Sequence, residues 1–408
     1  MKVRRKQHLA GLIGVTALVM AVCAPQLRAA DVPPKPDAAT IAKLIRTAQM
    51  LDHACDASFD WMIHQQNEDG SYGRNPRTGK PYPSVGLTAM SLRAILSIPH
   101  EYAPQDGPFV TKPADWMKSV QKKDGAIVAD DEKTANYETA VAILALEKCK
   151  SFGVTDYDAT IANGVSYLKG CQYQPVAGDP KSGGVGYRSG DTKVDLPNTA
   201  FFIQALNAAG YKNDSPEFKN ALSFLERCQA SPEVNKLAWA KDQTDGGGRY
   251  NETGLTQDPK GQSTGAISYV LMSSYMKLDV PDNDPRMVAV LNYVANHYST
   301  EEHPGLGYDG LFYYYVMMSQ SLDEHARAAN LYRVKTADGT DHDWTVELGR
   351  KLLSLQARDG SFVNSKSGKY WESDSVLCTA YAMLAMGQCY HDIEHELDLY
   401  HIDIPDDD

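Results

Sequence analysis

A phrase that recurs along the chain is the feature that most constrains its fold. A helical pattern ends in glutamine, breaks at Asp359-Gly360-Ser361-Phe362 and resumes as a helix rich in alanine and leucine. The same phrase opens the folded part around Asp69-Gly70-Ser71-Tyr72, and weaker copies follow at Asp124-Gly125, Gly183-Gly184 and Asp245-Gly246. A phrase repeated at a regular offset marks a repeated structural unit. The sequence therefore predicts modules that each consist of a first helix, a glycine turn and a second helix.

The number and spacing of the modules predict the fold class. About six helix pairs, spaced by roughly 50 to 60 residues, are long for an open solenoid but sufficient to close a ring. The second helices, such as 140–146 and 380–386, lack a polar face, which is typical of helices buried on most sides. We expect an all-α, closed (α/α)6 toroid over residues 51–390, with the second helices inside. Aromatic residues after the turns are expected to pack between modules: Tyr72, Tyr187, Tyr250 and Phe362.

The two ends of the chain differ from the repeats. Residues 1–30 combine a basic start, an apolar run at 9–24 and small residues at Ala29 and Ala30, which is typical of a cleaved signal peptide. They predict a periplasmic or secreted protein with no transmembrane span in the mature chain. Residues 31–50 are expected to form a proline-rich linker and the start of the first helix. The acidic residues 391–408 are expected to form a tail that ends in disorder.

The overall charge bears on the partners that the chain can bind. The formal net charge is −12 and the sequence pI is about 5.4. Nucleic-acid binding needs a basic stripe or patch, and no basic run follows the N-terminus. The sequence therefore argues against a nucleic acid as the partner.

The cysteines predict one disulfide bond. Seven cysteines become six after removal of the signal, an even number in an oxidising compartment. Cys171 and Cys228 each end the first helix of a module, so neighbouring modules are expected to bring them together as a bridge. Cys55 and Cys389 can meet only if the array closes, and two buried thiols explain them equally well.

At this point the residues resemble a known superfamily. A first helix that ends in glutamine, an Asp-Gly-Ser-aromatic turn and an alanine-rich second helix resemble the repeats of squalene-hopene cyclases and protein prenyltransferase β-subunits. This terpenoid-cyclase resemblance spans about Asp52 to Met386. The phrases at 195–199, 305–315 and 370–374 are similar to those of exported bacterial members whose function is not settled. The resemblance implies an α/α toroid with a central cavity.

Squalene-hopene-type cyclases protonate an alkene with an Asp-x-Asp-Asp-Thr-Ala motif. The corresponding phrase here begins at Asp195 and keeps only its first acid, because the second falls at Pro197 and the third at Asn198. Asp195 and Asn198 are the catalytic candidates that this resemblance suggests. The competing interpretation is that Asp195 caps a helix that begins near Pro197.

Protein prenyltransferases bind zinc through an Asp-x-Cys pair and a later histidine. The nearest match keeps Asp309 but has Leu311 in place of the cysteine, and the histidine position falls at about Cys378. Asp309 and Cys378 are therefore weak metal candidates, with Asp309 and Asp374 as further catalytic candidates. A turn aspartate and a buried thiol explain Asp309 and Cys378 more simply. No cofactor is expected.

The remaining candidates are aromatic and acidic residues near the starts of second helices. Such residues can line a cavity for a flat hydrophobic ligand or stack on sugar rings, although core packing also explains the tyrosines. The candidates are Tyr137, Glu138, Tyr269, Tyr313, Tyr314, Trp371, Glu372 and Tyr381.

Three functions are compatible with this sequence. The first is a cyclase- or prenyltransferase-like protein that binds or transforms a hydrophobic ligand of isoprenoid type, with degenerate acid and zinc positions. The second is a non-catalytic binding or scaffold module of the cell envelope, with a protein or glycan as its partner. The third is a glycan-active toroid that uses a pair of carboxylates. The sequence leaves open whether the protein is an enzyme.

Overall fold

The computed structural model describes residues 33–405, except for residues 76, 101, 103–106, 130, 131, 155, 330 and 331. The predicted signal peptide therefore lies outside the described residues. Residues from Lys35 onward form one compact unit. In the described part of the chain, every helix is too short or too polar to cross a membrane.

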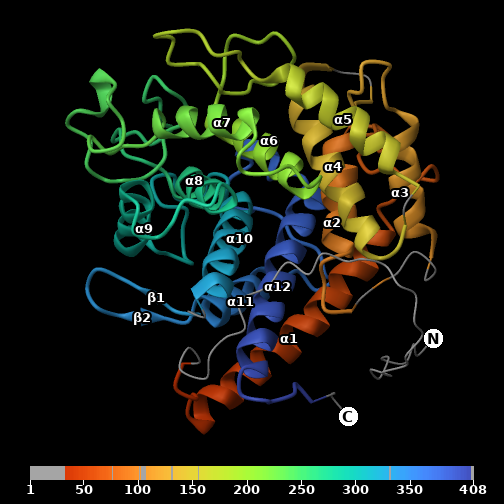
Figure 1. Cartoon of the computed structure of the whole chain (residues 1–408). Coiled ribbons are helices and arrows are strands. Elements are labelled where there is room, and N and C mark those ends of the chain that lie inside the picture. The colour runs from red at the N-terminus through yellow and green to blue at the C-terminus, as the bar shows by residue number, and fades with distance from the viewer. Residues whose placement is uncertain are drawn as a thin grey trace, which may run out of the picture. The chain divides into compact units, whose positions relative to one another are not determined.

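Twelve α-helices cover the described residues, and they alternate between an inner and an outer position (Figure 1). The inner helices are α2 (Val85–Ile95), α4 (Ala135–Ser151), α6 (Leu196–Ala208), α8 (Gly265–Lys277), α10 (Leu311–Ala329) and α12 (Ser375–Asp398). The outer helices are α1 (Ala38–Ile63), α3 (Pro108–Ser119), α5 (Asp158–Cys171), α7 (Pro216–Glu226), α9 (Pro285–His297) and α11 (Trp344–Leu355). The remaining elements are the 3₁₀ turns at Glu132–Thr134, Ala238–Ala240 and Lys369–Trp371 and the strands β1 (Val334–Lys335) and β2 (Asp341–His342).

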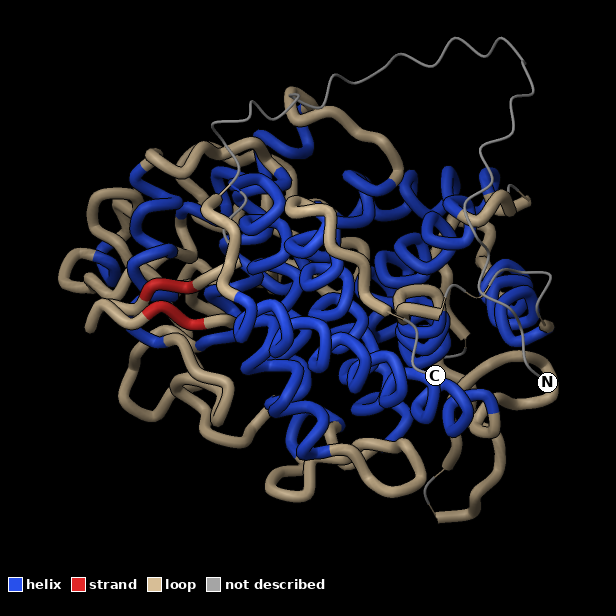
Figure 2. The backbone as a smooth tube through the Cα atoms, turned by 90° about the horizontal axis from the view of Figure 1, so that it is seen from below, coloured by secondary structure: helices blue, strands red, loops and turns tan. Residues whose placement is uncertain are grey.

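The inner helices close a ring. Each contacts the next in the order α2, α4, α6, α8, α10 and α12, and α12 contacts α2 again. Figure 1 shows α12 between α10 and α2, and the first and last outer helices, α1 and α11, contact each other. The chain is therefore an all-α toroid of six helix pairs, which confirms the predicted fold class. The antiparallel hairpin of β1 and β2 lies at the edge of the helices (Figure 2).

In four modules the glutamine of the repeat joins the module to the next one. Gln172 donates from Nε2 to the carbonyl of Gly183 in its own turn (3.0 Å) and to that of Glu217 on the following outer helix (2.9 Å). Gln121, Gln229 and Gln356 make the corresponding pairs of bonds. The repeated glutamine is therefore a fixed crosslink, and Gln356 uses it to bond the last module to the first.

On five of the six inner helices, a threonine or serine hydroxyl accepts a hydrogen bond from the backbone of the glycine turn. The backbone N–H of Tyr72 donates to Thr88 Oγ1 (2.9 Å), and the N–H of Phe362 donates to Thr379 Oγ1 (2.9 Å). Thr139, Thr199 and Ser268 accept in the same way from Ile127, Val185 and Gly248. The α9–α10 module departs from this scheme, and its turn contains His303 instead.

We expect the glutamine crosslink to be a measurable part of the stability. Gln172→Ala removes the donor from two carbonyls and should lower the free energy of unfolding by about 1–3 kcal/mol. The control Gln65→Ala removes a 3.4 Å bond from the turn after α1 to the carbonyl of Trp61, four residues earlier, and should cost less than about 0.5 kcal/mol. Urea unfolding of both variants measures the difference. Equal losses would show that the crosslink contributes nothing beyond ordinary helix packing.

The predicted disulfide is not formed. All six described cysteines are free and buried. The Cys171 thiol donates to the carbonyl of Tyr167 on its own helix (3.4 Å), and Cys228 has no exposed surface. The shared position at the end of a first helix therefore does not bring these two thiols into a bond. Cys55 and Cys389 are likewise free thiols, on the contacting helices α1 and α12.

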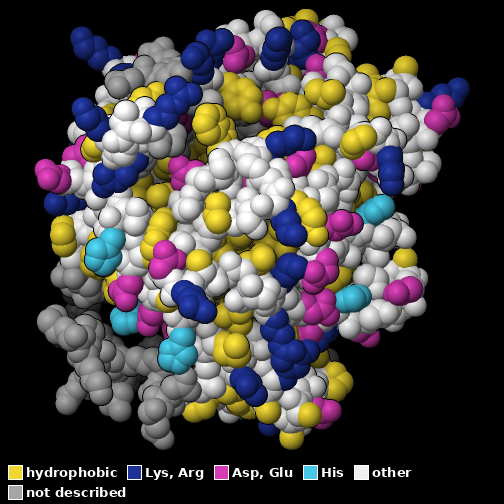
Figure 3. Space-filling view, turned by 180° about the vertical axis from the view of Figure 1, so that it is seen from behind, with side chains coloured by type: hydrophobic (Ala, Val, Ile, Leu, Met, Phe, Trp, Pro, Cys, Tyr) yellow, Lys and Arg dark blue, Asp and Glu magenta, His cyan; other side chains and the backbone are white. Residues whose placement is uncertain are grey.

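The acidic C-terminal stretch is part of the fold. Helix α12 continues through Asp398, so residues 391–398 are helical rather than a separate tail. Asp392 is fully buried and accepts from Arg327, and Glu396 accepts from Arg333. Burial and these ion pairs explain why the acidic composition does not indicate disorder there. On the face shown in Figure 3, basic and acidic side chains are interspersed over the described surface.

Candidate functional site

A cavity of about 280 Å³ lies at the N-terminal ends of the inner helices. Helices α4, α6, α8, α10 and α12 each contribute to its wall, and the loops that precede them complete it. The described residues that line it are Tyr137, Tyr187, Pro197, Asn198, Phe201, Tyr250, Gln257, Thr264, Ala266, Ile267, His303, Leu306, Gly310, Tyr313, Tyr370 and Tyr381.

Aromatic rings from different modules meet in this wall. Tyr137 and Phe201 pack edge to face with ring centroids 5.0 Å apart, and Tyr313 and Tyr381 lie 6.1 Å apart. The hydroxyl oxygens of Tyr187 and Tyr250 are 3.2 Å apart. Since these contacts join residues far apart in the sequence, the cavity exists only in the closed ring.

His303 is held in its neutral form at the cavity wall. Its Nε2 accepts from the backbone N–H of Ala266 (2.9 Å), and its Nδ1 lies 2.8 Å from the carbonyl of Asp309. These partners require Nδ1 to carry the proton. Burial lowers the pKa of His303 to about 4. Among the described lining residues none is Asp, Glu, Lys or Arg, so the wall that they form is uncharged at neutral pH.

Asp195 lies behind this wall as the N-cap of α6. Its carboxylate accepts from the backbone N–H of Asn198 (2.8 Å) and from the Asn198 amide (2.8 and 3.0 Å). Asn136 donates in turn to Asn198 Oδ1 (3.2 Å). Burial raises the pKa of Asp195 to about 6, although hydrogen bonds from Asn198 and Tyr250 oppose the shift. The sequence-based interpretation of Asp195 as a helix cap agrees with this geometry.

Glu372 is buried at the start of α10 rather than in the cavity wall. Its Oε1 accepts from the backbone N–H of Tyr313 (2.8 Å), and its Oε2 accepts from Asn364 Nδ2 (2.6 Å). Burial raises the pKa of Glu372 to about 7, and the N–H groups of the first turn of α10 oppose the shift. The carboxylate thus fixes the helix start that carries the cavity residue Tyr313.

The other acidic candidates have structural partners. Asp374 caps α12 through the N–H groups of Val376 (2.8 Å) and Leu377 (3.2 Å). Asp309 accepts from Ser367 Oγ (2.6 Å) and pairs with Lys369, and this hydrogen bond lowers the pKa of Asp309.

The metal candidates are not part of a ligand cluster. The Cys378 thiol donates to the carbonyl of Glu372 (3.2 Å), and the Asp309 carboxylate is occupied by Ser367 and Lys369. Among the described residues, no group of three or more His, Cys, Asp or Glu side chains could hold a metal ion.

Some of the predicted aromatic candidates line the cavity, and others are buried away from it. Tyr137, Tyr313 and Tyr381 line the cavity together with Asn198. Tyr269 and Tyr314 are buried side by side, with ring centroids 5.8 Å apart.

Glu138 and Trp371, the last two cavity candidates from the sequence, do not line the cavity. Glu138 accepts from the hydroxyl of Thr134 (3.2 Å), and Trp371 is 82% exposed.

Several cavity residues were not predicted. Tyr187 and Tyr250 were expected to pack between modules, but Tyr187 is 38% exposed and both line the cavity. The residues that occupy the turn position of Tyr72 are Val185 and Gly248, as their bonds to the inner helices show. His303 was also missed, although it lies in the one module whose turn departs from the glutamine pattern.

Tyr370 and Trp371 have unusual backbone conformations at the cavity edge. Their φ angles are 56° and 66°, in the left-handed region that non-glycine residues seldom occupy. The aromatic ring of Tyr370 lies over Gly310, where a Cβ would come within 3.1 Å of it. Such strain is retained only where surrounding contacts hold it. Here the adjoining Lys369 is held by Asp309.

Comparisons with known proteins agree on the fold. No family model matches the sequence, and no curated protein matches it. A protein from Actinoplanes has a similar structure, with a TM-score of 0.52 and 13% identity over 83% of this chain and 99% of that one. The type II terpene cyclase MstE from Scytonema is similar with a TM-score of 0.51 and 12% identity, over 85% of this chain and 99% of the cyclase. These likenesses support the α/α toroid.

Proposed function

We propose that the chain binds a small, uncharged hydrophobic ligand of isoprenoid type in the aromatic cavity. The observation that carries this proposal is the cavity wall, whose described residues are aromatic, aliphatic or neutral polar. Ligand pockets commonly combine such apolar walls with a few polar groups that orient the ligand. The fold likeness to a type II terpene cyclase is compatible with a terpenoid ligand.

We propose that the chain binds this ligand but does not cyclise it by protonating an alkene. Such cyclisation needs a protonated carboxylic acid directed at the alkene. Asp195 is the only acid of the cyclase phrase that remains; it is not among the residues that line the cavity, and its carboxylate accepts hydrogen bonds from the Asn198 amide. Pro197, which lies in the cavity wall where the cyclases have their proton donor, has no proton to give.

Two alternative functions need charged side chains that the described residues of this wall lack. A prenyl diphosphate needs cationic partners, and glycoside hydrolysis uses two carboxylates on opposite sides of the bond. The described lining residues provide neither. The cavity volume of about 280 Å³ is at the lower end of ligand pockets, which favours a short isoprenoid over a triterpene. We include export in the proposal, because of the signal-like residues 1–30.

Occlusion of the cavity tests the proposal. Leu306→Trp places a larger side chain in the wall and should weaken binding of geraniol or farnesol at least about tenfold, since the ligand and the indole compete for one volume. Val288→Trp is the matched control, because Val288 is 42% exposed on the outer helix α9. Native mass spectrometry and calorimetric titration of the purified chain measure binding.

The same titrations separate the alternatives. Binding of both alcohols to the wild type and the control, with loss in Leu306→Trp, supports the proposal. Binding of a cello- or chito-oligosaccharide without either alcohol would favour the glycan interpretation. Absence of alcohol binding, or equal binding by Leu306→Trp, would rule out this cavity as the isoprenoid site.

A further inference from the structure

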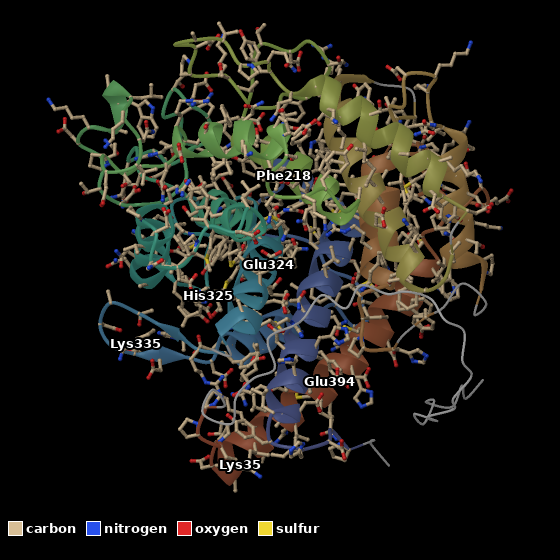
Figure 4. All side chains as sticks on the ribbon, in the orientation of Figure 1. Lys35, Phe218, Glu324, His325, Lys335 and Glu394 are labelled. Atoms are coloured by element: carbon tan, nitrogen blue, oxygen red, sulfur yellow. The ribbon has the colours of Figure 1, made fainter. Side chains whose placement is uncertain are left out.

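A second cavity of about 510 Å³ lies at the opposite, C-terminal ends of the inner helices. Its wall is formed by α2, α4, α10 and α12 and by the residues that follow α2 and α4. The described residues that line it are Arg93, Leu96, Ser97, Ile98, Lys148, Phe152, Gln320, Arg327, Leu384, Gln388, His391, Glu394, His395 and Asp398. Figure 4 shows Glu394 on the C-terminal part of α12. Unlike the aromatic cavity, this one is strongly polar.

Arg93 lines this cavity and has no carboxylate partner among the described residues. Its only hydrogen bond among the described residues is from Nη1 to the sulfur of Met90 (3.6 Å). Three other arginines of the fold have carboxylate partners: Arg286 with Asp284 and Glu226, Arg327 with Asp323 and Asp392, and Arg333 with Asp343 and Glu396. Arg227 instead donates to the carbonyls of Pro180 and Ser182. A guanidinium carries five N–H donors, so most of the donors of Arg93 have no protein acceptor.

The surroundings of Arg93 explain why an anion would be favoured there. Burial lowers the pKa of Arg93, and the described groups that oppose this shift are the hydroxyls of Tyr137 and Tyr381. Both tyrosines line the aromatic cavity, so Arg93 lies between the two cavities. The C-terminal dipole of α2 attracts the charge of Arg93 but accepts none of its side-chain hydrogen bonds. A poorly hydrated cation with open donors is stabilised most by a bound anion.

Two carboxylates, Glu394 and Asp398, line the same cavity, and among the described residues neither forms an ion pair with Arg93. Lys148 adds a further positive charge to the wall. Arg327 is paired with Asp323 and Asp392, and His391 lies 3.6 Å from Glu394. Burial and the nearby Arg327 lower the pKa of His395, which leaves it uncharged at neutral pH.

The rest of the wall suits the carbon skeleton of a ligand. Leu96, Ile98, Phe152 and Leu384 provide apolar surface beside the polar groups. An anion that carries a carbon chain therefore fits the cavity better than a bare inorganic ion.

We propose that this second cavity binds a small organic anion, with a carboxylate or phosphate head on Arg93 and a short apolar chain against Leu96, Phe152 and Leu384. Planar guanidinium groups bind both kinds of head through paired N–H donors. The site is separate from the aromatic cavity and does not depend on the function proposed for it.

The test compares ligands that differ only in charge and variants that differ in position. Calorimetric titration of the full chain uses hexanoate, the neutral hexanol and inorganic phosphate as probes. We expect hexanoate to bind the wild type at least about tenfold more tightly than hexanol. Arg93→Gln should weaken hexanoate binding about 10- to 100-fold, since it removes a charged hydrogen-bond partner. Arg350→Gln is the matched control, because it removes the same charge from the exposed side of α11.

Each outcome decides the proposal. Binding of hexanoate that Arg93→Gln loses and Arg350→Gln keeps supports a carboxylate head, and the same pattern with phosphate alone supports a phosphate head. Equal binding of hexanoate and hexanol, no anion binding, or unchanged binding by Arg93→Gln would overturn it. If Arg93→Gln does not fold, two other measurements decide the proposal. One is the comparison of hexanoate with hexanol on the wild type. The other is the Arg93→Lys variant, which keeps the positive charge but lacks the planar donors. Leu306→Trp should leave this site unaffected.

Discussion

Gly360→Ala should be among the most destabilising single-methyl changes in this fold, with an expected loss of about 2–5 kcal/mol in the free energy of unfolding. Gly360 has a φ of +88°, and a left-handed conformation costs an alanine about 1–2 kcal/mol. A Cβ there would also lie 2.2 Å from the carbonyl oxygen of Ala57 on α1. Relief of this overlap requires backbone displacement at the seam that closes the ring, which adds about 1–3 kcal/mol.

A second glycine separates the two contributions. Gly178 also has a positive φ, of +78°, but a Cβ there would meet nothing within 4 Å. Gly178→Ala should therefore show only the backbone cost of about 1–2 kcal/mol. Urea unfolding measured for both variants gives the difference directly. If the two losses are equal, the contact between the turn and the next outer helix is not what requires glycine at Gly360.

The turns illustrate what the sequence can predict. Gly70, Gly125, Gly183 and Gly246 each have a positive φ and lie against the backbone of the following outer helix, as Gly360 does. These contacts recur in module after module, so they leave the same residues at the same offsets. A repeated signal of this kind was sufficient to predict the helix pairs, their inner and outer positions, and the closed ring.

The cavity shows where the prediction from sequence ends. Tyr187 and Tyr250 come from long irregular loops, and their hydroxyls meet only after α4, α6 and α8 have been placed. No spacing along the chain encodes that meeting, because each loop is positioned by contacts with another module. Tyr137, Tyr313 and Tyr381, which the sequence suggested as candidates, line the cavity. They lie near the starts of inner helices, where the repeat itself fixes their position.

The positions of the charged candidates were hard to predict for a related reason. A carboxylate near the start of an inner helix can face the cavity or accept hydrogen bonds from exposed N–H groups of a helix end, and the sequence looks the same in both cases. Asp195 and Asp374 cap their own helices. Glu372 instead caps α10, whose first turn lies 59 residues earlier in the chain. Only the tertiary structure reveals a cap that comes from another module.

Glu372→Ala should lower the free energy of unfolding by roughly 2–4 kcal/mol and also loosen the aromatic cavity. Glu372 is fully buried, and its loss leaves the backbone N–H of Tyr313 without this acceptor. The Asn364 amide loses one of its two bonds and keeps the other, to the carbonyl of Tyr308 (2.7 Å). Each unsatisfied buried donor costs about 1–3 kcal/mol. Asp374→Ala is the control within the same loop. It removes an ordinary N-cap and should cost about 0.5–2 kcal/mol, because water can replace the carboxylate at a helix end that is less buried.

The pH dependence of the unfolding free energy is a second test of the structural role of Glu372. Its pKa is about 7 in the fold against an ordinary value of 4.5, so the folded state holds a proton that the unfolded state has already released. The stabilising effect of this protonation is complete below about pH 4.5 and is lost as the pH rises to about 7. Glu372→Gln cannot titrate, so its unfolding free energy should decline less than that of the wild type across this window. If the unfolding free energies of the two proteins change in parallel with pH, Glu372 is ionised throughout this window. Its bonds to Tyr313 and Asn364 would then stabilise the charged form more than burial destabilises it.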